Sequence, residues 1–79
     1  MPLYFFDTRD NDSFVRDEIG LELPDLKAVK AEAAVSLAEL ARDVLPSCLK
    51  RELAVEARDE WQPVLRATLT FEAVILVPA

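Results

Sequence analysis

The sequence predicts a small α+β domain with the element order β-β-α-β-β, in which one helix packs on one face of a four-stranded, mainly antiparallel sheet. Two observations predict this fold. Apolar residues recur every three or four positions between Pro24 and Pro46, which is helical spacing, and two later segments alternate apolar with polar residues, which is strand spacing. The 79 residues are enough for one domain, residues 1–79, with a modest core.

The first third of the chain predicts a β-hairpin. Residues 3–7 are rich in aromatic side chains and are typical of a strand. The sequence DTRDND has the composition of a turn, because Asp and Asn side chains hydrogen-bond their own backbone. Residues 13–16 are then expected to return as a second strand. Gly20 marks a bend that needs a positive φ or a close approach of the backbone.

The central third predicts a helix over about residues 24–45. Pro24 suits the first turn, where its missing N–H costs nothing, and Asp25 in that turn complements the positive end of the helix dipole. Pro46 ends the helix. The expected core stripe consists of Leu26, Val29, Ala33, Leu37, Leu40 and Val44. Small residues on the far side are interpreted as a choice for helix propensity, with a partner-helix contact as the alternative.

The last third predicts a second hairpin. ELAVEARD at residues 52–59 and VLRATLTFE at residues 64–72 alternate as half-buried strands, and DEWQP forms the loop between them. Counting outward from the loop places Glu52 opposite Phe71. The strand order 2-1-3-4 is favoured because it keeps every neighbour antiparallel, although placing the first strand against the fourth would better explain the apolar residues 73–77.

Residues 73–77 run past the end of their partner strand and are apolar on both faces. Such a segment needs cover on both sides, either from the first strand or from a second chain. Trp61, at the loop tip, either folds back over its own sheet or contacts a partner. The sequence therefore predicts a homodimer without enzymatic activity that acts by protein–protein contact. The interface candidates are Trp61, Val74, Ile75, Leu76 and Val77.

The acidic residues around Gly20 raise the question of a ligand or metal site. A calcium loop starting at Asp7 would need an oxygen ligand at the position of Arg9 and a glycine at that of Asp12, so calcium is not expected. Asp7 and Asp17 are interpreted as capping turns and accepting backbone N–H groups. The alternative is an acidic binding site of Asp7, Asp17 and Glu18. The chain has no His, so neither a cofactor nor a metal is predicted.

The net charge of −6 disfavours nucleic acid and anionic membranes and favours a basic protein partner. No targeting segment is visible, and no apolar stretch is long enough to span a bilayer. The lone cysteine, Cys48, excludes an internal disulfide and is interpreted as an apolar filler at the helix exit. These features predict a cytoplasmic protein.

The stretches MPLYFFDTRDND, RDEIGLELPDL and LAVEARDEWQPVLRATLTFE, with the alanine-rich helix, resemble a family of short uncharacterised bacterial proteins common in alphaproteobacteria. The resemblance covers nearly the whole chain and implies no established activity. It rests on Tyr4, Phe5, Phe6, Asp7, Asp17, Gly20, Leu26, Ala33, Arg58 and Asp59. Trp61 and Gln62 depart from the pattern, which argues against a two-residue primed turn. ELPDL and the element order also resemble antitoxin-like domains, which would imply an adaptor for a basic partner.

Overall fold

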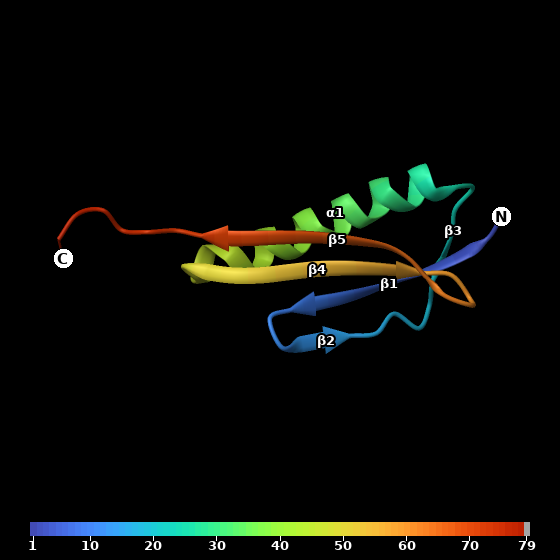
Figure 1. Cartoon of the computed structure of the whole chain (residues 1–79), viewed down its shortest axis with the longest axis horizontal. Helices are drawn as coiled ribbons and strands as arrows, with labels where there is room; N and C mark the ends of the chain where they lie inside the picture. Colours follow the sequence, from blue (N-terminus) through green and yellow to red (C-terminus); the bar gives the residue numbers. More distant parts are fainter. Residues whose placement is uncertain (79) are drawn as a thin grey trace.

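The computed structural model describes residues 1–78 and shows one helix packed on an antiparallel sheet (Figure 1). The elements are β1 (Leu3–Asp10), β2 (Ser13–Val15), β3 (Leu21–Glu22), α1 (Leu26–Val44), the 3₁₀ helix η1 (Leu45–Ser47), β4 (Lys50–Arg58) and β5 (Pro63–Glu72). The predicted α+β fold is confirmed. The short strand β3 was not predicted and makes the sheet five-stranded.

The sheet has the order β2-β1-β4-β5, and β3 pairs with the start of β1. All of these pairs are antiparallel, as the favoured strand order requires. The alternative, in which β1 lies against β5, is wrong because β4 lies between the two strands. The first strand therefore does not cover the apolar residues that follow β5.

The core lies between α1 and the neighbouring strands β4 and β5. The buried helix residues Val29, Ala33, Leu37 and Ala41 follow each other at intervals of four. They pack against the fully buried Leu53, Val55 and Ala57 of β4 and against Tyr4 of β1. Leu26, expected in this stripe, is 53% exposed because it begins the helix, at the end that diverges from the sheet in Figure 1.

The helix begins two residues later than expected, and the role of Asp25 changes accordingly. Asp25 is the N-cap residue, with extended φ and ψ of −160° and 176°, and its carboxylate accepts the N–H of Ala28 at 2.9 Å. Pro24 therefore precedes the helix instead of occupying its first turn. At the other end, Pro46 lies in η1, and α1 ends at Val44.

The first strand is longer than expected, because the turn is confined to Asn11 and Asp12. Asn11 has a φ of 53°, a left-handed conformation that Asn tolerates well. Residues 8–10 extend β1, and Asp10, the last of them, is held by the guanidinium of Arg51 at 2.6 Å. The second strand ends at Val15, one residue earlier than expected.

The register of the β4–β5 hairpin differs from the expected one by one residue. Glu52 lies opposite Thr70 instead of Phe71, because the hairpin closes with Arg58 opposite Pro63 and not with Asp59 opposite Val64. An irregularity between Ala57 and Arg58 then shifts the pairing by one residue. None of the loop residues 59–62 has the positive φ that a primed turn requires, so the loop is not a two-residue primed turn, as expected. Among residues 1–78, no helix combines the length and the apolar character needed to cross a bilayer.

Candidate functional site

The outer edge of β1, away from β4, is paired with two short strands that are separated by an insertion. Thr8 lies opposite Val15 in β2, and Tyr4 lies opposite Leu21 in β3. Four steps along β1, from residue 8 to 4, therefore face six steps along the other strand, from residue 15 to 21. The two extra residues do not pair with β1. At this point the outward-facing backbone groups of β1 therefore have no strand to hydrogen-bond with.

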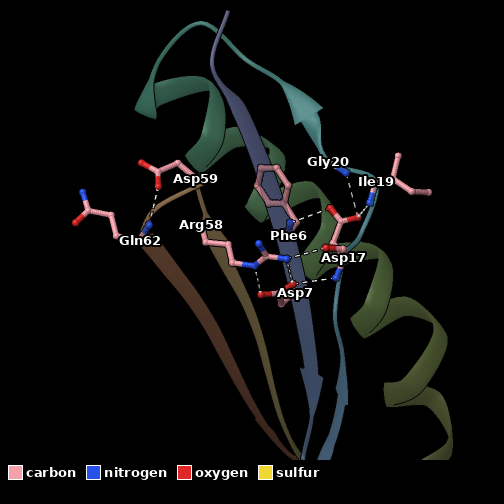
Figure 2. Close-up of polar contacts among 8 residues, drawn as sticks. All are labelled: Phe6, Asp7, Asp17, Ile19, Gly20, Arg58, Asp59 and Gln62. Carbon is pink, nitrogen blue, oxygen red and sulfur yellow. Dashed lines mark hydrogen bonds and ion pairs between the residues drawn. The ribbon is translucent and has the colours of Figure 1, made fainter.

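The carboxylate of Asp17 fills this gap in the ladder (Figure 2). Its Oδ2 atom accepts the N–H of Phe6 at 3.0 Å, which is the bond that a neighbouring strand would otherwise supply. Its Oδ1 atom accepts the N–H groups of Ile19 and Gly20 at 3.0 and 3.3 Å. Asp17 therefore fixes both the edge of β1 and the turn that leads into β3.

Asp7 and Arg58 hold Asp17 in place from the sheet. The N–H of Asp17 donates to Asp7 Oδ1 at 2.9 Å, and Arg58 Nε donates to Asp7 Oδ2 at 3.0 Å. Arg58 Nη2 also donates to the backbone oxygen of Asp17 at 2.8 Å. The guanidinium lies over the Phe5 ring, with Cζ 4.4 Å from the ring centroid. We call these three charged residues the Asp7–Asp17–Arg58 cluster.

Every carboxylate oxygen of the cluster accepts at least one hydrogen bond. The side chains of Asp7 and Arg58 are 8% and 21% exposed, so the pair is largely shielded from water. The sequence-based interpretation of Asp7 and Asp17 as acceptors of backbone N–H groups agrees with this geometry. The cluster can fasten residues 16–20 across the edge of the sheet.

Burial tends to raise the pKa of Asp17, but hydrogen bonds from Phe6, Ile19 and Gly20 and the charge of Arg58 outweigh it, so the pKa is lowered. Ionised Asp17 therefore stabilises the fold above the unfolded pKa of about 3.9, and this stabilisation is lost as the pH falls through the lower folded value. We expect acidification from about pH 7 to about pH 2 to lower the urea concentration at the midpoint of unfolding less in Asp17→Asn than in the parent. A parallel slope in both proteins would contradict this assignment.

Gly20 adopts a φ of +81°, and a Cβ placed there would lie 3.0 Å from both Leu3 Cδ1 and Phe5 Cε1. We expect Gly20→Ala to lower the free energy of unfolding by at least about 1–2 kcal/mol, from the left-handed backbone alone. Equilibrium unfolding in guanidinium chloride measures the loss. Gly20→Asn separates the left-handed backbone from the crowding of the Cβ, because Asn tolerates this φ but adds the same Cβ. A smaller loss of unfolding free energy in Gly20→Asn than in Gly20→Ala would identify the backbone conformation as the cause.

The structure separates Glu18 from the other two predicted acids, since Glu18 is exposed and Asp7 and Asp17 meet. Beside them is an open hollow of about 500 Å³ lined by Phe6, Thr8, Val15, Arg16, Asp17, Glu18 and Ile19. Among residues 1–78, no three His, Cys, Asp or Glu side chains are grouped as a metal ion would require. Sequence reasoning did not assign Arg58 to this site, although Arg58 was among the residues that carried the family resemblance.

The interface candidates lie at two opposite ends of β5 (Figure 1). After β5, the N–H of Ala73 donates to the Leu49 oxygen at 2.7 Å, and the chain then leaves the sheet. Residues 74–77, which we call the C-terminal arm, are 68%, 69%, 89% and 72% exposed. At the other end, Trp61 is 84% exposed, so the interpretation that it folds back over its own sheet is wrong.

The geometry of the loop explains the exposure of Trp61. Asp59 Oδ1 accepts the N–H of Gln62 at 2.7 Å (Figure 2) and the N–H of Trp61 at 2.7 Å. The N–H of Asp59 donates to the Gln62 oxygen at 2.9 Å. These bonds close a compact turn. The indole is therefore presented to solvent from a loop whose backbone is held by hydrogen bonds.

The comparisons with known proteins assign a family. Residues 3–70, which include β1 to β4, most of β5 and the whole Asp7–Asp17–Arg58 cluster, match a domain of unknown function, DUF6894. The chain belongs to the DUF6894 family. Comparison of this DUF6894 chain with curated proteins and with solved structures found no significant match. The C-terminal arm lies outside the part of the chain that matches the DUF6894 family.

Proposed function

We propose that this chain is a non-enzymatic protein–protein interaction module that forms a homodimer through its C-terminal arm. The observation that carries the proposal is the arm itself: four consecutive apolar residues project beyond the end of β4, and none is less than 68% exposed. Apolar surface of this kind on a small domain is typical of a contact with another chain. The half-buried, lone Cys48 is consistent with a reducing compartment such as the cytoplasm.

The arm offers enough apolar surface to support association. Full burial of a Val, Leu or Ile side chain contributes about 1.5–3 kcal/mol, so burial of both arms in a dimer gives on the order of 12 kcal/mol even at the lower figure. Loss of translational and rotational freedom opposes association by about 4–15 kcal/mol. With the cost near the low end of that range, about 4 kcal/mol, the net gain is about 8 kcal/mol, so we expect a dimer in the micromolar range instead of a very tight complex.

The Asp7–Asp17–Arg58 cluster supports the non-enzymatic part of the proposal. A carboxyl group that acts as a general acid or base must offer an oxygen to the substrate, and a carboxylate nucleophile must be free to attack. Here the oxygens of Asp7 and Asp17 accept backbone and guanidinium hydrogen bonds. These bonds anchor residues 16–20 to the edge of the sheet, and this structural role accounts for the cluster without catalysis.

Sedimentation velocity at micromolar concentrations tests the proposal. We expect the parent to sediment as a dimer and the Val74→Lys, Leu76→Lys double variant as a monomer with an unchanged circular dichroism spectrum, because ammonium groups resist burial in an apolar contact. Trp61→Ser is the matched control, since it removes an exposed apolar side chain at the far end of β5 and should leave the dimer intact. A monomeric parent would overturn the proposal.

A further inference from the structure

The free edge of β5 has a defined set of outward-facing backbone groups. β5 is the outer strand of the sheet, and among residues 1–78 it pairs only with β4. The N–H of Ala73 points toward β4, because it donates to the Leu49 oxygen. Backbone groups alternate in direction along a strand, so Thr70 and Glu72 face the free edge, and Val74 and Leu76 continue this series if the arm stays extended.

We propose that the arm of each copy pairs in antiparallel fashion with the free edge of β5 in a second copy, about a two-fold axis that passes between the two Ala73 residues. This inference rests on the proposed homodimer and specifies its geometry. The second copy is the occupant because one continuous segment, residues 69–77, supplies both the unpaired edge and the unpaired arm. A two-fold axis satisfies both at once, with the same patch used on each copy.

The faces of the sheet limit the allowed registers to a few. Directly opposed residues of an antiparallel pair lie on the same face, so under two-fold symmetry the axis must fall on one residue. An axis at Glu72 would set two carboxylates against each other, which is destabilising. An axis at Val74 pairs only residues 71–77. An axis at Ala73 pairs residues 69–77, and it is the register in which the whole arm, residues 74–77, lies against the last four residues of β5 in the second copy, residues 69–72.

The Ala73 register also matches side chains on both faces. On the helix face, Ile75 lies opposite Phe71 of the second copy, and Val77 lies opposite Leu69, both of which are half-buried in β5. At the outward-facing positions, Val74 pairs with Glu72 and Leu76 with Thr70, and each pair exchanges two backbone hydrogen bonds. The two sheets thereby join into one continuous sheet with both helices on the same side.

Disulfide cross-linking tests the register. In a Cys48→Ser background, we compare Ala73→Cys with its neighbour Val74→Cys. Opposed residues of a non-hydrogen-bonded pair have Cα atoms about 4.5 Å apart, within the range for a disulfide, whereas the two Val74 residues would be offset by two positions and about 8 Å apart. We expect Ala73→Cys to form a covalent dimer on mild oxidation at least about tenfold faster than Val74→Cys.

The outcomes separate this inference from the proposed function. A dimer by sedimentation that cross-links as fast through Val74→Cys as through Ala73→Cys would overturn the register and leave the homodimer standing. A dimer that cross-links at neither position would also overturn the register and leave the homodimer standing, with its contact elsewhere on the chain. A monomer by sedimentation, with the Cys48→Ser chain folded by circular dichroism, would overturn both.

Discussion

Replacement of Asp7 by alanine is expected to lower the free energy of unfolding by about 3 kcal/mol, at the low end of the range for breaking a buried ion pair. The Asp7 side chain is 8% exposed and accepts hydrogen bonds from the Asp17 N–H and from Arg58 Nε. Its removal leaves a largely buried guanidinium without its charge partner and a backbone N–H without its acceptor. The anchor of residues 16–20 is lost at the same time.

Urea unfolding at neutral pH measures this loss, and a matched pair of variants tests its cause. Asp10→Ala also removes a carboxylate–arginine pair from β1, but the partners are 22% and 32% exposed, so we expect a clearly smaller loss. Asp7→Asn keeps an acceptor for the Asp17 N–H and should fall between the parent and Asp7→Ala. Equal losses in Asp7→Ala and Asp10→Ala would refute a special role for the Asp7–Asp17–Arg58 cluster.

The parts of the fold that were predicted correctly are those whose signal is local. In residues 52–58, the alternation of apolar and polar residues identifies the buried face of β4, because side chains of a strand point to opposite faces in turn. The helical spacing of Val29, Ala33 and Leu37 identifies the buried face of α1 in the same way. Both patterns can be read within a few residues, without knowledge of the partner element.

The parts that were missed depend on residues that are distant in sequence. Arg58 lies 51 residues from Asp7 and 41 from Asp17, so no local spacing connects the three. The extension of β1 runs through residues 8–10, where the sequence has turn composition, and its last residue is held by Arg51 from β4. Turn chemistry indicated that the chain reverses, but tertiary contacts decided at which residue.

The register of the second hairpin could have been predicted from the sequence by a different rule. Counting from the loop placed Leu53 opposite Thr70, which belongs to the other face of the sheet. Directly opposed residues share a face, so Leu53 had to lie opposite Leu69 or Phe71, and it lies opposite Leu69. The count failed because it started from Asp59 opposite Val64, whereas the hairpin closes with Arg58 opposite Pro63 and the irregularity between Ala57 and Arg58 then shifts the pairing by one residue.

The same pairing leads to the second large prediction: Leu53→Ala should lower the free energy of unfolding by about 3 kcal/mol, within the range of 2–5 for a buried leucine. Leu53 is 2% exposed and packs with Leu37 and Val55. In a domain of this size, the loss corresponds to a fall in melting temperature of roughly 12–24 °C, which calorimetry can measure.

A double-mutant cycle then shows whether that loss depends on the observed register. Leu53 and Leu69 are cross-strand neighbours in one core, so the combined substitution should deviate from additivity by about 0.5–1 kcal/mol. Thr70, which the loop count placed opposite Leu53, is exposed on the other face, and Thr70→Ala should be additive with Leu53→Ala. Coupling to Thr70 but not to Leu69 would restore the register counted from the loop, and the faces of β5 would exchange. Residues 75 and 77 would then no longer continue the helix face, so the cycle also tests the alternation on which the arm register depends.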